Sequence, residues 1–425
     1  MGEDWLSEGL NHIWLPYTQM KTVPAPIPVA SAEGVRLTLS DGRELIDGVS
    51  SWWTAVHGYR HPHIEQAVRD QLERLPHVML GGLAHEQAYR LSTRLAALLP
   101  GDLSRVFYSE NGSVSVEIAM KMAVQYWLNK GERRTRFLSF KGGYHGDTFM
   151  TMSVCDPEEG MHSLFTGVVP EQLVINLPED EASIAAFESA LDRYGHETAA
   201  VVMEPLVQGA GGMVFHEAET LALIRKACDA HNVLLILDEI FTGFGRLGTL
   251  FACEQAGVVP DIITLSKALT GGTLPLAATV AREHVFNAFY TDNPADALMH
   301  GPTYMGNALA CAAANASLDL FEREPRLDQV RAIEKRLAAG LEPAREIPGV
   351  VDVRTRGAIG VIQVKEMRTL DELKARFVAA GVWIRPFRDI IYTTPPYVIG
   401  QDDLDRLTTT LVEVTAAWSK DVGFA

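Results

Sequence analysis

The chain has 425 residues, 47% of them hydrophobic, which is enough for one large core and a smaller second one. Its 37 basic and 54 acidic residues give a formal net charge of −17, and the sequence has no basic run of the kind that binds nucleic acid. No apolar run approaches the roughly 20 residues that span a bilayer, and the acidic start Met1–Glu8 does not resemble a secretion signal. We therefore expect a cytoplasmic globular protein with neither nucleic acid nor a membrane as partner.

Short apolar segments alternate with helical stretches through the middle of the chain. Strands are expected at residues 105–108, 136–140, 199–203, 233–237 and 262–265. This alternation is typical of an α/β fold with a mainly parallel sheet covered on both faces. A helix is expected over residues 114–127, with Ser113 as its cap. Smaller elements follow, with strands at 350–354, 360–364 and 382–384 and helices at 371–380 and 402–418.

Metal ligands are not apparent in the sequence. The cysteines Cys155, Cys228, Cys253 and Cys311 are widely spaced and indicate reduced core thiols. The motif His61-Pro62-His63 lacks a carboxylate or cysteine that would complete a ligand set. We expect no metal.

Glycine-containing turns follow several of the expected strands. The turn 109–113 leads directly into a helix, whose free N–H groups and dipole favour an anion such as phosphate, although an ordinary strand-to-helix turn has the same pattern. In the turn 141–147, Tyr144 lies between glycines, where its ring can stack on a flat ligand. The cluster 208–213 lacks the third glycine of a dinucleotide fingerprint.

Two strand ends carry an amine and an acid. Lys267 follows the strand 262–265, and Asp238 follows the strand 233–237. Open α/β sheets bind ligands beyond the carboxyl ends of their strands, so the two side chains are a candidate cofactor pair. Pyridoxal phosphate requires such a pair, a lysine that binds it covalently and an acid at its pyridine nitrogen. Taken alone, each residue is more often a solvated side chain or a turn residue.

Four motifs together resemble the class III, pyridoxal-phosphate-dependent aminotransferases. They are Leu237–Arg246, Ser266–Gly272, Tyr144-His145-Gly146 and Gly301-Pro302-Thr303, and the resemblance covers nearly the whole chain. It implies a fold-type I architecture, with a large α/β domain over residues 50–320 and a small α+β domain built from residues 1–49 and 321–425. It also implies pyridoxal 5'-phosphate as cofactor and a homodimer with shared active sites.

The resemblance assigns roles around the cofactor. Lys267 would bind it and move the substrate proton, with Asp238 at the ring nitrogen, Tyr144 stacked on the ring and Tyr17 as a further catalytic residue. Gly112 and Ser113 would hold the phosphate. Pro302 and Thr303 would complete that phosphate site, with Thr303 supplied by the neighbouring subunit.

Within the class, four stretches resemble the branch that serves biotin biosynthesis: Trp14–Tyr17, Ser50–Gly58, His77–His85 and Gly381–Phe387. That branch aminates 8-amino-7-oxononanoate to 7,8-diaminopelargonate. Its usual donor is S-adenosyl-L-methionine, and a relative that uses lysine is the alternative. The implied substrate residues are Tyr17, Trp52, Trp53, Tyr144, Asp147, Arg246, Lys267, Gly301, Arg385 and Tyr392. Among them, Arg385 would bind the distant carboxylate.

Other functions stay open at this stage. Phe241 and Pro275 depart from the biotin branch, which has a small residue at the first position and usually lacks the proline, and the turn 109–111 reads Ser-Glu-Asn where the branch more often has an aspartate and a serine. A class III aminotransferase for ω-amino acids or ornithine is the nearest alternative. The missing fingerprint argues against a dinucleotide oxidoreductase, and the presence of both Lys267 and Asp238 argues against a non-catalytic protein of the same fold.

Overall fold

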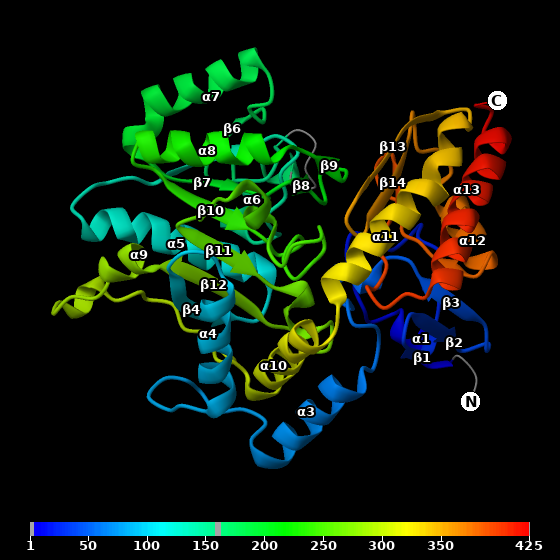
Figure 1. Cartoon of the computed structure of the whole chain (residues 1–425), viewed down its shortest axis with the longest axis horizontal. Coiled ribbons are helices and arrows are strands. Elements are labelled where there is room, and N and C mark those ends of the chain that lie inside the picture. Colours follow the sequence, from blue (N-terminus) through cyan, green and yellow to red (C-terminus); the bar gives the residue numbers. More distant parts are fainter. Residues whose placement is uncertain (1–3, 158–162, 425) are drawn as a thin grey trace.

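A seven-stranded sheet forms the centre of the larger half of the molecule, in a computed structural model that describes residues 4–157 and 163–424 (Figure 1). Its strand order is β4-β12-β11-β10-β7-β5-β6. All neighbours pair in parallel except β12, which is antiparallel to both β11 and β4. The strands are β4 (Leu103–Ser109), β5 (Arg136–Phe140), β6 (Leu173–Ile175), β7 (Thr198–Met203), β10 (Leu234–Asp238), β11 (Ile262–Leu265) and β12 (Ala277–Arg282). The five strands expected in this region are confirmed, and the carboxyl ends of β5, β7, β10 and β11 share one edge.

Helices cover both faces of this sheet, because alternate strand residues point to opposite sides. Ala200, Val202 and Ile236 pack with the long helix α5 (Gly112–Asn129), whereas Val201 and Leu237 belong to the core on the other face. The other helices of this half are α3 (Pro62–Arg74), α4 (Glu86–Leu98), α6 (Phe149–Met152), α7 (Glu181–Tyr194), α8 (Ala218–Ala230), α9 (Glu283–Asn287) and α10 (Ala308–Arg323), with a short hairpin of β8 (Val207–Gln208) and β9 (Val214–Phe215).

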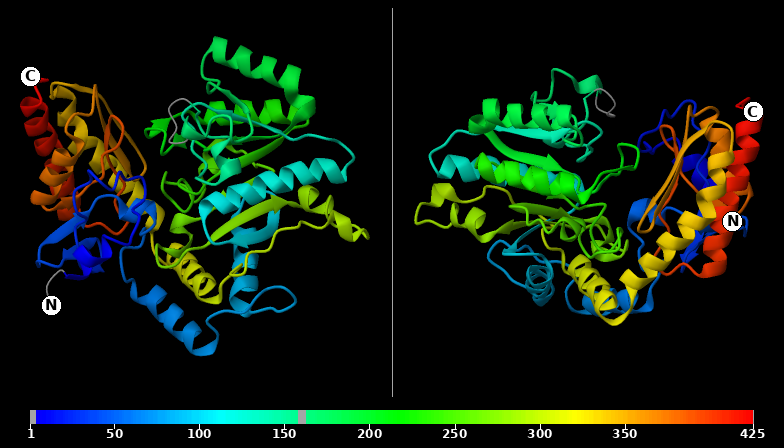
Figure 2. Two further views of the ribbon diagram at one scale, coloured as in Figure 1. Left: turned by 180° about the vertical axis from the view of Figure 1, so that it is seen from behind. Right: turned by 45° about the horizontal axis from the view of Figure 1, so that its top comes forward.

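The second half of the molecule combines segments from both ends of the chain (Figures 1 and 2). One sheet has the order β1-β2-β3-β15 and the other has the order β13-β14-β16. Their strands are β1 (Val29–Glu33), β2 (Arg36–Leu39), β3 (Glu44–Asp47), β13 (Val350–Arg356), β14 (Ile359–Val364), β15 (Val382–Trp383) and β16 (Ile390–Thr393). The helices are α1 (Asp4–Gly9), α11 (Arg326–Leu341), α12 (Leu370–Ala379) and α13 (Gln401–Asp421). The structure therefore has the expected mixture of small strands and helices here, while the domain bounds 49/50 and 320/321 stay a prediction.

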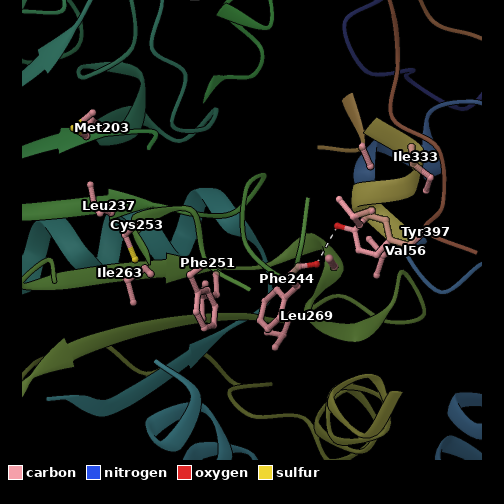
Figure 3. Packing of buried hydrophobic residues seen from close by; sticks show 14 of the residues in the cluster. Val56, Met203, Leu237, Phe244, Phe251, Cys253, Ile263, Leu269, Ile333 and Tyr397 are labelled. Carbon is pink, nitrogen blue, oxygen red and sulfur yellow. Dashed lines mark hydrogen bonds between the residues drawn. The ribbon is translucent and has the colours of Figure 1, made fainter. Parts of the chain in front are cut away.

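One apolar core connects the two halves. Figure 3 shows it running from Met203 and Leu237 in the large sheet, past Phe244, to Ile333 on α11. At the junction, the Tyr397 hydroxyl donates a hydrogen bond of 3.0 Å to the Phe244 carbonyl. This continuity fixes the carboxyl edge of the sheet relative to the second half, so that a site between them is built from both.

The predicted cap of the helix after β4 is wrong. Asn111, not Ser113, precedes α5, and its side chain accepts a hydrogen bond of 3.0 Å from the Val114 N–H. The helix begins two residues earlier than expected, at Gly112, so Ser113 lies in its first turn and its hydroxyl accepts instead from the Asp147 N–H at 3.1 Å. Within residues 4–157 and 163–424, no helix combines the length and apolarity needed to cross a bilayer.

Candidate active site

A cavity of about 290 Å³ lies at the carboxyl edge of the large sheet. We call it the inner cavity. Its walls are supplied by the turns that follow β4, β5, β7, β10 and β11, as open α/β sheets position their ligands. The lining residues are Trp53, Asn111, Gly112, Ser113, Tyr144, His145, Gly146, Glu204, Ala210, Asp238, Ile240, Phe241, Ser266 and Lys267. Six predicted site residues, Gly112, Ser113, Trp53, Tyr144, Asp238 and Lys267, are thus brought together.

Lys267 extends into this cavity from the turn after β11. It has a left-handed φ of 42°, and the preceding Ser266 hydroxyl anchors the turn by donating to the Leu276 carbonyl at 2.8 Å. The Lys267 Nζ lies 4.5 Å from the ring centroid of Trp53. Desolvation by the surrounding protein lowers the pKa of Lys267 to about 8, although the charges of Asp238 and Glu204 oppose this shift. A substantial share of the amine is therefore neutral near physiological pH.

Asp238 ends β10 and is almost fully buried. Its Oδ1 accepts from the Ile240 N–H at 3.2 Å and from the Thr264 hydroxyl at 3.3 Å. Its Oδ2 lies 2.9 Å from Nδ1 of His145, which is also buried. Burial alone would lower the pKa of His145, but the Asp238 carboxylate outweighs burial and raises it. The carboxylate is held in one orientation by groups on both of its oxygens.

Two buried polar residues of this cavity were not assigned a role by the sequence analysis. His145 was quoted as part of the Tyr144-His145-Gly146 motif, but nothing in the sequence indicated that it contacts Asp238. Glu204 directly follows β7, and it accepts hydrogen bonds from the N–H groups of Tyr144 at 3.1 Å and Gly209 at 2.9 Å. Burial raises the pKa of Glu204 to about 7. Its place in the sequence could have indicated Glu204, since this acid, like Asp238, comes at the end of a buried apolar run.

The first turn of α5 forms the opposite end of the inner cavity. A side chain at Gly112 would place its Cβ 2.9 Å from the Ile240 side chain, and one at Gly146 would meet the Ser113 hydroxyl at 2.3 Å. Glycine is required at Gly146, which has a φ of 127° and whose Cβ would also lie 2.8 Å from the Ser113 Cα, whereas at Gly112 the Ile240 side chain would have to shift. The N-terminus of an 18-residue helix, with its free N–H groups and positive dipole end, thus borders this end of the cavity and favours an anion there.

A second cavity of about 390 Å³ adjoins the inner one and shares Lys267, Trp53, Tyr144 and Ala210 with it. We call it the outer cavity. It also contains the predicted residues Tyr17, Trp52, Arg385 and Tyr392, which come from distant parts of the chain. Its remaining lining residues are Gly142, Gly143, Cys155, Asp156, Gly211, Phe387 and Arg388.

Hydroxyl groups and a guanidinium of the outer cavity contact its aromatic residues. The Tyr17 hydroxyl lies 3.1 Å from the Tyr144 hydroxyl and donates a hydrogen bond to Asp147. The guanidinium of Arg385 lies 4.8 Å from the ring centroid of Trp52. The outer cavity therefore combines aromatic side chains with the amine of Lys267 and the guanidinium groups of Arg385 and Arg388.

Trp52 and Trp53 reach the outer cavity from an unusual backbone turn. The residues Ser50, Ser51, Trp52 and Trp53 have φ values of 49°, 46°, 56° and 73°, all in the left-handed region. Hydrogen bonds from Trp53 N–H to Val49 O at 2.9 Å and from Thr54 N–H to Ser50 O at 2.8 Å close one left-handed helical turn. Each non-glycine residue in this conformation costs roughly 1–2 kcal/mol, so surrounding contacts must hold the turn in place.

Several predicted residues lie outside both cavities of this chain. Arg246 is buried and donates to the carbonyls of Ala358 at 3.2 Å and Pro395 at 3.0 Å. Gly301, Pro302 and Thr303 lie in the loop before α10 and line neither cavity. Phe241, the departure noted in the sequence, is buried against Trp53 with ring centroids 4.3 Å apart and lines the inner cavity.

Comparison with known proteins supplies the family. The family profile described as aminotransferase class-III matches residues 17–415. The chain belongs to the class III aminotransferases. Among the relatives of this class III chain is the adenosylmethionine-8-amino-7-oxononanoate aminotransferase of Mycobacterium leprae, 46% identical over 95% of this chain and 94% of the relative. The protein of that name from Corynebacterium glutamicum is 45% identical over 94% of this chain and 96% of its own length.

Solved structures of class III enzymes confirm the fold predicted from the resemblance. The crystal structure of adenosylmethionine-8-amino-7-oxononanoate aminotransferase from Methanocaldococcus jannaschii has a TM-score of 0.93 and 33% identity, and the match covers 97% of this chain and 98% of that one. An amine transaminase from an uncultivated Pseudomonas species has a TM-score of 0.89 and 30% identity, over 96% and 98% of the two chains. The recognition as a class III aminotransferase and the α/β fold with a mostly parallel sheet are both confirmed.

Proposed function

We propose that this chain is the aminotransferase of biotin biosynthesis that converts 8-amino-7-oxononanoate to 7,8-diaminopelargonate, with S-adenosyl-L-methionine as amino donor. The relatives of 41–46% identity that carry this activity in their names support the proposal, since each match extends over at least 93% of this chain. The cofactor of the class is pyridoxal 5'-phosphate.

The observation that carries the proposal is the set of side chains around the outer cavity. The cavity is lined by the amine of Lys267, by the guanidinium of Arg385, and by the aromatic rings of Trp52, Trp53 and Tyr17. An aliphatic keto acid matches this arrangement, because its methylenes bury apolar area at about 0.8 kcal/mol each while its carboxylate pairs with the guanidinium. The ketone then faces Lys267.

The inner cavity fits pyridoxal 5'-phosphate. It presents an amine of lowered pKa, a buried carboxylate, an aromatic ring and the N-terminus of a long helix. We propose that Lys267 binds the cofactor covalently, that Asp238 holds its ring nitrogen, and that Tyr144 stacks on its ring. Gly112 and Ser113 would hold its phosphate. When bound, the cofactor supplies an electron sink for the carbon that loses its proton.

Lys267 is the proposed carrier of the substrate proton. Its amine lies in a desolvated cavity, and a general base works best when its pKa is close to the working pH. The value of about 8 meets that condition. Tyr17 is proposed to act beside it, because its hydroxyl, bonded to Asp147 and Tyr144, borders the outer cavity.

The active unit is proposed to be a homodimer with shared active sites. Gly301, Pro302 and Thr303 line neither cavity of their own chain, and the large apolar side chains of the neighbouring residues Met299 and Tyr304 are exposed in the single chain. A second copy that covers this surface would bury those side chains and bring Thr303 to the partner's phosphate site.

The absorbance spectrum of the purified protein tests the proposal. Addition of 7,8-diaminopelargonate should convert the lysine-bound cofactor to its aminated form in a single half-reaction. The diamine itself gives the amino group, so S-adenosyl-L-methionine is not needed. Ornithine or an ω-amino acid that converts the cofactor in place of the diamine would contradict the proposal in favour of another class III activity. S-adenosyl-L-methionine and lysine, added separately, then identify the donor, and conversion by lysine alone would refute the donor assignment.

A further inference from the structure

The left-handed turn Ser50–Trp53 has no glycine, so its conformation depends on contacts with residues around it. One buried side chain bonds the backbone of this segment at two places. Asp47, the last residue of β3, accepts a hydrogen bond on Oδ1 from the Val49 N–H at 2.8 Å. Its Oδ2 accepts from the Ser51 N–H at 2.9 Å. The carboxylate therefore satisfies two backbone donors that the left-handed turn leaves without a helical partner.

The Asp47 carboxylate is also held by side chains outside the turn. It is fully buried, and its Oδ2 accepts a second hydrogen bond from the Tyr59 hydroxyl at 2.5 Å. Burial raises the pKa of Asp47, while the hydrogen bonds from Tyr59, Val49 and Ser51 oppose that rise. The buried guanidinium of Arg246 interacts electrostatically with the same carboxylate. A buried acid with this set of donors has one orientation available to it.

Asp47 connects two walls of the outer cavity. In the sheet it is the register partner of Trp383 on β15, two residues before Arg385. The next residue, Gly48, donates to the Trp383 carbonyl at 3.0 Å. The guanidinium of Arg385 in turn lies 4.8 Å from the ring centroid of Trp52. The relative position of Trp52 and Arg385 in the outer cavity is thus set at Asp47.

We propose that Asp47 is a positioning residue for the keto substrate. Its carboxylate holds the left-handed turn, and the turn places Trp52 and Trp53 along the outer cavity. Asp47 lines neither cavity, so it acts through the two tryptophans. The inference rests on the proposed function, because the affinity that it changes is that for 8-amino-7-oxononanoate.

The test compares Asp47→Asn with Tyr59→Phe in the cofactor-loaded enzyme. An asparagine amide turns an N–H₂ group toward the Ser51 N–H or the Val49 N–H, so that donor faces donor. Tyr59→Phe removes a bond to the same carboxylate and the contact of the Tyr59 hydroxyl with the Ser51 hydroxyl, and it leaves both backbone bonds of Asp47 intact. We expect Asp47→Asn to raise the KM for 8-amino-7-oxononanoate about tenfold or more, with kcat and cofactor affinity changed by less than about threefold. Tyr59→Phe should change the KM far less.

A glycine at position 51 separates the turn from other effects of Asp47. Glycine adopts the left-handed region without steric cost, so Ser51→Gly added to Asp47→Asn should recover a large part of the lost affinity. A loss that came from the unpaired charge of Arg246 would not respond to glycine, and that result would overturn the proposal. If Asp47→Asn alone does not fold, the comparison is made between the double variant Asp47→Asn/Ser51→Gly and the single variant Ser51→Gly.

Two results separate this inference from the proposed function. A wild-type spectrum that ignores 7,8-diaminopelargonate refutes the proposed function itself. If the wild-type enzyme responds to the diamine, two results for Asp47→Asn would overturn the role of Asp47 and leave the function in place. One is an unchanged KM, and the other is an equal impairment of kcat, KM and cofactor affinity.

Discussion

The Nδ1 of His145 and the Oδ2 of Asp238 lie 2.9 Å apart, and both side chains are almost fully buried. Asp238 raises the pKa of His145 against the effect of burial. The contact fixes the Asp238 carboxylate in the inner cavity, where we propose that it holds the ring nitrogen of the cofactor. His145 comes from the turn after β5 and Asp238 ends β10, so the orientation of the carboxylate depends on a contact between distant segments.

Asp238→Asn is expected to retain cofactor but to lower kcat by about two orders of magnitude, because a neutral amide does not stabilise a positive ring nitrogen. Single-turnover spectra of the half-reaction with 7,8-diaminopelargonate measure this step directly. His145→Gln keeps Asp238 and removes only its buried partner, so its loss should be smaller. Transamination by Asp238→Asn at the wild-type rate would show that Asp238 has another role.

The lowered pKa of Lys267 predicts how cofactor loading depends on pH. A lysine amine attacks an aldehyde only when neutral, and a pKa of about 8 instead of 10.5 makes half of the amine neutral at about pH 8. The rate at which the apoprotein takes up pyridoxal 5'-phosphate covalently should rise with pH and level off above about pH 9. Lys267→Ala should give no borohydride-trapped adduct and no turnover. A loading rate that still climbs above pH 10 would contradict the lowered pKa.

The sequence was sufficient for five of the seven strands of the large sheet, whereas β6 and β12 were not expected; the central strands β7, β10 and β11 are fully buried. Such strands are mostly apolar runs, as in residues 233–237 and 262–265, and their ends mark the site. The cap of α5 was wrong because Asn111 and Ser113 are both capping residues, and the choice between them depends on where the turn after β4 ends. Residues His145 and Glu204 were missed for a related reason, since a buried polar role depends on tertiary partners.

The substrate side of the site could not be derived from local pattern. Tyr17, Trp52 and Arg385 come from three separate segments, and only the resemblance to a family placed them together. The left-handed turn at Ser50–Trp53 has no glycine to indicate it, and Ser50 is held by a hydrogen bond of 2.7 Å to the carbonyl of Thr394. The roles of these residues, and that of the buried Arg246, stay predictions.

Arg385→Lys is expected to raise the KM for 8-amino-7-oxononanoate about tenfold or more, because an ammonium lacks the two-pronged geometry that pairs with a carboxylate. The charge is kept, so kcat at saturation should change little. An amino ketone that lacks the carboxylate provides the control, since wild type and variant should use it equally well. Arg368→Lys, at a half-buried arginine that pairs with Glu366 and lines neither cavity, should have no effect on this KM. An unchanged KM would refute the carboxylate site.

Mixed dimers test the shared active site. If Thr303 serves the phosphate of the partner subunit, a dimer of one Lys267→Ala chain and one Thr303→Val chain has one site with both defects and one site with none. Co-purification of two differently tagged chains gives this species, and its single lysine-bound cofactor should have wild-type affinity. If each chain instead used its own Thr303, that cofactor would sit in a site lacking the threonine. It would then bind as weakly as in the Thr303→Val homodimer, and the arrangement across subunits would be wrong.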